Sequence, residues 1–143
     1  MVIVNDRADV ALISGAAGVH LGQTDLPPVA ARQILGPDRI VGFSTHNMEQ
    51  ALQADKLPVD YIAIGPIFAT VSKENPDPVL GVEELARIVQ SIHKPVVAIG
   101  GITLENGGGV VRAGVQSVAV IHNILSAPNI PERVREWIDS PPF

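Results

Sequence analysis

Two aspartates follow two consecutive hydrophobic runs of the chain. Asp6 ends the run VIVND, and Asp25 comes shortly after the run VHLG. If both runs are parallel strands of one sheet, the two carboxylates lie above the same edge of that sheet. Two carboxylates, completed by water and by phosphate oxygens of a substrate, make a typical Mg2+ site. In the alternative interpretation, Asp6 and Asp25 only cap the helices that follow them.

The stretch IGPIFATVSK offers a second group of side chains that could do chemistry. Thr70, Ser72 and Lys73 fall within four residues of one another, in a loop after a predicted strand. Hydroxyls, backbone amides and an ammonium group can bind phosphate or diphosphate and neutralise its charge. A surface lysine is more often only solvated, so it is the position at the carboxyl end of a strand that favours a functional role.

Glycines mark a third candidate. Gly100 and Gly101 follow the run PVVAI and precede a helical segment. Glycine lets the backbone approach an anion closely, and the start of a helix offers free amides. The context favours phosphate binding, although similar turns occur without a ligand. The glycines at 107–109 fall inside a helical segment and predict a weakened helix.

Ser44 and His122 also end predicted strands. Ser44 has no evident base or acid partner in the sequence, so a hydrolytic triad is not supported and a hydrogen-bonding role is predicted. His122 is predicted to face the phosphate-binding region. His20 and His93 are interpreted as structural residues, and His46 as a residue that settles the turn after a strand.

These residues must be positioned by an α/β fold, because short Val- and Ile-rich runs alternate with helical segments. Strands are predicted at 2–6, 19–22, 39–44, 60–65, 95–100 and 117–121, and helices at 8–16, 27–35, from about 47, and at 82–93, 104–113 and 131–138. Near-continuous hydrophobic strands are covered on both faces, as in a parallel barrel or a doubly wound sheet. Both architectures remain open from the pattern alone.

The length bears on how such a sheet is completed. An eight-unit barrel takes about 250 residues, and compact ones about 200, so 143 residues are about two units short. The first and last strands would then have unpaired backbone groups. We therefore expect a homo-oligomer through the exposed sheet edges, or poor solubility.

Composition excludes several function classes. The net charge of −5 and ten scattered basic residues do not predict a nucleic-acid or anionic-membrane binder. The chain has no cysteine, hence no disulfide or thiolate site. It has no apolar run of about 18 residues and no basic leader before an apolar run. A single cytoplasmic domain over residues 1–143, acting on small phosphates, is expected.

Five segments together resemble the thiamine-phosphate synthase family. They are NDR at 5–7, GVHLGQTDLP at 18–27, STHN at 44–47, DYIAIGPIFATVSK at 60–73 and PVVAIGGIT at 95–103. Their order and spacing fit the family over essentially the whole chain. The resemblance implies a (β/α)8 TIM barrel truncated to about six units, with the first two missing. It also implies an enzyme that joins hydroxymethylpyrimidine diphosphate to thiazole phosphate in a dissociative, Mg2+-assisted step.

The resemblance also implies roles for individual residues. Asp6 and Asp25 are expected to hold Mg2+. Asn5, Ser44 and Lys73 are expected to contact the pyrimidine diphosphate, with Ser44 and Lys73 as the catalytic pair. The thiazole phosphate is expected to be bound by Thr70, Val71, Ser72, Gly101, Ile121 and His122.

The sequence departs from the family pattern in three places. An earlier cluster of glutamine, leucine, arginine and lysine that grips the diphosphate is absent, Ala69 replaces a proline, and His122 replaces a serine. Two alternatives stay open. One is a related thiazole tautomerase, which has a histidine where this chain has Pro66, and the other is a non-catalytic phosphate-binding remnant of the family.

Overall fold

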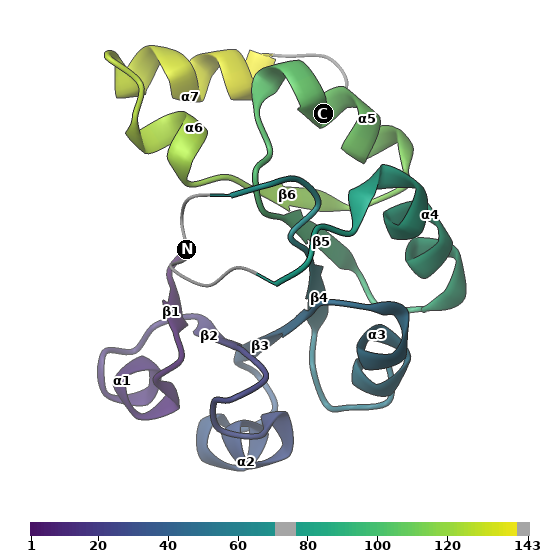
Figure 1. Cartoon of the computed structure of the whole chain (residues 1–143). Coiled ribbons are helices and arrows are strands. Elements are labelled where there is room, and N and C mark those ends of the chain that lie inside the picture. The colour runs from purple at the N-terminus through teal and green to yellow at the C-terminus, as the bar shows by residue number, and fades with distance from the viewer. Residues whose placement is uncertain (71–76, 140–143) are drawn as a thin grey trace.

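The computed structural model describes residues 1–70 and 77–139, and these form a curved parallel sheet with helices along its convex side (Figure 1). The strands are β1 Ile3–Asn5, β2 Gly18–Leu21, β3 Ile40–Thr45, β4 Tyr61–Ile64, β5 Val96–Ile99 and β6 Ser117–Ala119. The helices are α1 Ala8–Ile13, α2 Pro28–Leu35, α3 Met48–Ala54, α4 Gly81–Ser91, α5 Leu104–Arg112, α6 His122–Leu125 and α7 Ile130–Asp139. Neighbouring strands pair in the order of the sequence.

This arrangement confirms the truncated (β/α)8 barrel that the family resemblance implied, which the hydrophobic pattern alone left open against a doubly wound sheet. A doubly wound sheet has helices on both faces, whereas here the helices cover the outside of an arc, as in part of a (β/α) barrel (Figure 1). The six predicted strands are confirmed, each to within a few residues. The fold is a truncated barrel of six parallel β/α units in the described part of the chain.

The core lies between the sheet and the helices. Successive strand side chains point to opposite faces, and one set is fully buried: Val19 and Leu21 in β2, Val41 in β3, and Ile62 in β4 are each 0% exposed. In β5, Val96 and Ala98 belong to this buried set, whereas Val97 and Ile99, which point to the other face, are only partly buried. The second set faces the concave side of the arc, where a barrel has its lumen.

Local sequence signals explain several helix boundaries. The Asn47 side chain accepts a hydrogen bond of 2.9 Å from the Gln50 amide, so Asn47 caps α3, the helix that the sequence predicted to begin at about residue 47. The paired prolines start α2. Helix α5 runs through all three of its glycines, also as predicted, behind a capping box formed by Thr103 and Asn106. The short helix α6 was not predicted.

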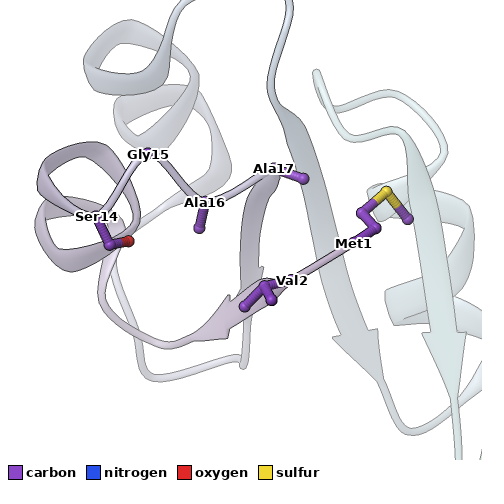
Figure 2. Close-up of a pocket in the computed structure, with 6 residues that line it drawn as sticks. All are labelled: Met1, Val2, Ser14, Gly15, Ala16 and Ala17. Atoms are coloured by element: carbon purple, nitrogen blue, oxygen red, sulfur yellow. The ribbon is translucent and has the colours of Figure 1, made fainter.

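The two outer strands leave open edges. Among the described residues, β1 pairs only with β2 and β6 only with β5. A hollow lies at the amino end of β1, and Figure 2 shows the residues that line it: Met1, Val2, Ser14, Gly15, Ala16 and Ala17. None of these has an ionisable side chain, and the hollow lies at the opposite end of the strands from the predicted site. We therefore interpret this hollow as part of the open edge of the sheet and not as part of the predicted site.

Within residues 1–70 and 77–139, no helix has both the length and the apolar character needed to cross a bilayer.

Candidate active site

The carboxyl end of β1 presents two exposed polar residues. Asp6 has a φ of 65°, an unusual left-handed conformation that aspartate tolerates better than most residues. Its amide donates to the His20 carbonyl at 2.8 Å, and its carboxylate accepts from the Asn5 side-chain amide at 2.8 Å. The turn thus ties Asn5 and Asp6 to each other and to strand β2.

Asp25 lies in the loop between β2 and α2. One of its carboxylate oxygens accepts a 2.6 Å hydrogen bond from the Gly22 amide, which fixes the side chain over the end of β2. Asp6 and Asp25 border the same hollow, together with Arg7, Ala8, Asp9, Leu26 and Ile34. The structure therefore places both residues at the border of one hollow, as a shared site would require.

An ion pair lies beside these carboxylates. The Arg7 guanidinium contacts the Asp9 carboxylate through two hydrogen bonds, of 2.8 Å and 2.5 Å. The hydrogen bond from Arg7 lowers the pKa of Asp9 to about 2, so Asp9 stays ionised at neutral pH. Because Arg7 and Asp9 largely neutralise each other, this pair adds little net charge to the hollow.

Ser44 is the buried polar residue of the site, with 8% exposure near the end of β3. Its hydroxyl oxygen lies 2.8 Å from Nε2 of His20, and Nδ1 of His20 lies 2.9 Å from the Tyr61 hydroxyl. The His20 and Tyr61 rings stack with 5.5 Å between centroids and 20° between planes. Ser44 thus has the predicted hydrogen-bonding role, and its partner is His20, which the sequence identified only as a structural residue.

Sequence reasoning also missed Tyr61 and Gln23. The Gln23 side chain donates to the Ser44 carbonyl at 2.6 Å and so links the loop of Asp25 to strand β3. Tyr61 pairs in register with Gly42, which pairs with His20. Only the strand register brings these residues together, and no local pattern in the sequence reports it.

The side of Gly101 on which a side chain would lie is occupied by the loop after β4. Gly100 and Gly101 have φ values of 90° and 64°, and a Cβ at Gly101 would overlap the Ala69 carbonyl and lie 2.8 Å from Cβ of Phe68. The glycine is required because the loop after β4 crosses this turn. Thr70 follows that contact directly, so the structure supports its proximity to Gly101.

The remaining candidates fall into two groups. Val71, Ser72 and Lys73 lie outside the described residues. Ile121 and His122 are exposed at the start of α6, so the prediction that His122 ends the last strand was wrong. The strand ends earlier, at Ala119, because the chain already turns into this short helix.

His46 links two loops on the same edge. Its Nδ1 atom lies 2.6 Å from the Gly65 carbonyl, and its Nε2 atom lies 3.5 Å from an Asp77 carboxylate oxygen. These contacts agree with the predicted role of His46 in settling the turn after β3.

A family model described as thiamine monophosphate synthase matches residues 1–124. The chain belongs to the thiamine monophosphate synthase family. A curated thiamine-phosphate synthase from Koribacter versatilis is 54% identical over 136 residues, which make up 95% of this chain and 64% of that protein. The predicted resemblance is therefore confirmed.

Solved structures agree with this assignment to the thiamine monophosphate synthase family. The thiamine phosphate pyrophosphorylase from Pyrococcus furiosus superposes with a TM-score of 0.85 at 40% identity, over 94% of this chain and 63% of that one. A 3-hexulose-6-phosphate synthase superposes with a TM-score of 0.65 at 18% identity over 90% of this chain, which shows a shared fold alone. The chain spans less than two thirds of the length of each of these three proteins.

The carboxylate pair suits the Mg2+ that membership in the thiamine monophosphate synthase family implies. Mg2+ prefers oxygen ligands and is usually bound through one or two carboxylates together with water and substrate phosphates. Asp6 and Asp25 supply two such carboxylates at one hollow. Residues 1–70 and 77–139 contain no group of three or more His, Cys, Asp or Glu side chains that could form an all-protein cage.

Proposed function

We propose that this chain acts as a thiamine-phosphate synthase, joining hydroxymethylpyrimidine diphosphate to thiazole phosphate with release of diphosphate. The observation that carries the proposal is that Asp6 and Asp25, from the segments after β1 and β2, both line one hollow. Family membership over residues 1–124 supports the same reaction. Ligands of parallel α/β sheets bind at the carboxyl edge of the sheet.

In the proposed reaction the bond between the pyrimidine methylene carbon and the diphosphate oxygen breaks first, and the electron pair leaves with the diphosphate. The thiazole nitrogen then donates its lone pair to the cationic carbon, so a C–N bond replaces the C–O bond. No proton transfer is required. The demands on the protein are therefore charge neutralisation and alignment.

The residues of this edge suit those demands. Asp6 and Asp25 are proposed to hold Mg2+, which when bound neutralises charge on the departing diphosphate. The Asn5 amide, the Ser44 hydroxyl and the Lys73 ammonium are proposed to bind the diphosphate oxygens. The thiazole phosphate is proposed to lie against Thr70, Val71, Ser72, Gly101, Ile121 and His122.

Two titrations and a product assay test the proposal. Calorimetry with thiazole phosphate, and separately with hydroxymethylpyrimidine diphosphate plus Mg2+, should report binding of each ligand, and both together should yield thiamine phosphate. Binding of thiazole phosphate without diphosphate binding or product would instead identify a non-catalytic phosphate-binding remnant.

Variants locate the diphosphate site. Asp25→Asn should weaken Mg2+-dependent diphosphate binding, and Lys73→Gln should lower both diphosphate affinity and turnover. The matched controls are Asp38→Asn and Lys56→Gln, which alter exposed residues in loops that lead into strands, at the opposite end of the sheet. Unchanged turnover in Lys73→Gln would contradict its assignment as a catalytic residue.

We also propose that the open edges of the sheet are covered by a second copy of the chain. Support comes from the unpaired edges of β1 and β6 in the described part of the chain, and from the exposure of Met1 and Val2 at 96% and 65%. Light scattering after size-exclusion chromatography tests this, and a monodisperse monomer contradicts it. A cytoplasmic location remains a prediction.

A further inference from the structure

Three strands contribute to one polar chain of contacts on the concave side of the sheet. His20 in β2, Gly42 in β3 and Tyr61 in β4 occupy the same register row, and Ser44 lies two residues further toward the carboxyl edge. Gly42 leaves room for the Tyr61 ring, because a Cβ at this position would overlap the ring carbons and the hydroxyl. The ring can therefore lie across β3 and reach His20.

The two contacts of the His20 ring constrain each other. A neutral imidazole has one nitrogen that donates and one that accepts. Either Tyr61 donates to Nδ1 and Nε2–H donates to Ser44, or Nδ1–H donates to Tyr61 and Ser44 donates to Nε2. The arrangements differ in which hydroxyl hydrogen stays available, that of Ser44 in the first and that of Tyr61 in the second.

The structure favours the first arrangement. Tyr61 lies deeper in the sheet, away from the carboxyl edge, and among the described residues its hydroxyl has a hydrogen bond only to His20. Burial raises the pKa of Tyr61, so the phenol keeps a hydrogen to donate. A donating Tyr61 uses this hydrogen, while the Ser44 hydrogen is left at the edge where ligands bind.

We propose that His20 is a positioning residue that donates Nε2–H to the Ser44 oxygen and so directs the Ser44 hydroxyl hydrogen toward an oxygen of a bound diphosphate. Tyr61 sets the tautomer of His20 through Nδ1. The inference rests on the proposed function, because it assumes that Ser44 contacts the diphosphate. It adds two residues, His20 and Tyr61, to those that prepare the site.

The tautomer can be measured without any substrate. In the 15N-labelled chain in mildly alkaline buffer, where imidazoles are neutral, the side-chain nitrogen shifts of His20 should report the Nε2–H form. His93 provides an internal comparison with the opposite bias, because the Asp55 carboxylate lies 3.0 Å from its Nδ1 atom. Tyr61→Phe should reduce the preference of His20 for the Nε2–H tautomer and leave the tautomer of His93 unchanged. An Nδ1–H tautomer at His20 would overturn the proposal.

The second test uses inorganic diphosphate with Mg2+ as the probe. His20→Leu should weaken its binding by about five-fold, the size expected for one misdirected hydrogen bond. His20→Gln, which keeps an N–H donor on a side chain of similar reach, should recover most of that loss. His93→Leu is the matched control and should bind like the original chain, because His93 lies in the loop before β5, far from the carboxyl edge.

A double-variant cycle separates positioning from a merely structural role. In a Ser44→Ala background, His20→Leu should cause no further loss of diphosphate affinity, because His20 acts through Ser44. The same five-fold loss in both backgrounds would overturn the inference. The tautomer and the diphosphate affinities do not depend on product formation, so failure of the synthase reaction is distinguishable from failure of this inference.

Discussion

Replacing Gly42 with alanine tests the packing that lets Tyr61 reach across the sheet. Gly42 lies in the middle of β3, in register with Tyr61 of β4. An added Cβ would overlap the Cζ and hydroxyl atoms of the tyrosine and lie 2.5 Å from its Cε1 atom. Since carbon atoms do not pack so closely, the ring must turn away from β3.

The expected cost has two parts and one offset. Forcing a group into a packed site costs about 1–3 kcal/mol. Displacing the ring also breaks the hydrogen bond to His20, which contributes about 1 kcal/mol. Alanine restricts the unfolded chain more than glycine does, which returns about 0.4–1 kcal/mol. The free energy of unfolding should therefore fall by about 2 kcal/mol.

Urea unfolding followed by tryptophan fluorescence provides the assay. Trp137 is the single tryptophan, is 8% exposed in the folded chain, and donates to the Asn123 side chain at 3.0 Å. Its emission should change when the chain unfolds. Tyr61→Ala gives the matched background, since removal of the ring leaves space for the new methyl group. There, Gly42→Ala should cost less than about 0.5 kcal/mol. An equal cost in both backgrounds would refute the explanation.

Of three further predictions, two concern residues far from the contact between Gly42 and Tyr61, and the third concerns the ionisation of the Tyr61 hydroxyl. Gly109→Ala should raise the free energy of unfolding by about 0.5–1 kcal/mol, because this helical glycine has no atom within 4 Å of an added Cβ; urea unfolding measures it, and a decrease would contradict the open packing. Asn47→Ala should lower thermal stability by about 1 kcal/mol through loss of its cap on Gln50, and an unchanged melting temperature would contradict this. Burial raises the pKa of Tyr61 above its ordinary 10.0, so the folded chain keeps this proton longer than the unfolded chain. Its contribution to stability should be complete below pH 10 and decline as pH rises further; ultraviolet titration of this single tyrosine, with Tyr61→Phe as control, checks it.

The aspartate pair could be predicted from the sequence, whereas the contacts among Ser44, His20 and Tyr61 could not. Asp6 and Asp25 are each found from local evidence, because each follows a hydrophobic strand and the carboxyl ends of parallel strands share one edge. The contact of Ser44 with His20 joins residues 24 apart, and that of His20 with Tyr61 joins residues 41 apart. Those contacts depend on strand register, which several alignments of the same hydrophobic runs could satisfy.

Gly42 and Gly101 illustrate the same limit. The sequence shows a glycine within a strand and a glycine in a turn, but not why a side chain is excluded at either position. The Tyr61 ring excludes one at Gly42, and the Phe68–Ala69 segment excludes one at Gly101. The sequence predicted a ligand beside Gly101, and the structure adds a second reason for the glycine, because a Cβ there would overlap the Ala69 carbonyl. The sequence around a glycine does not show which distant residue occupies the space that a side chain would need.

The sequence by itself determined the alternation of strands and helices, the start of a helix at about residue 47, the glycine-containing helix α5 and the family with its barrel fold, because these follow from periodicity, capping chemistry and motifs within a few residues. The hydrophobic pattern left the curvature of the sheet open, and only the tertiary structure decided that His20, Tyr61 and Ser44 meet on its concave side. The physical reason is that curvature and register arise from packing and hydrogen bonding between strands far apart in the chain, which no local segment specifies.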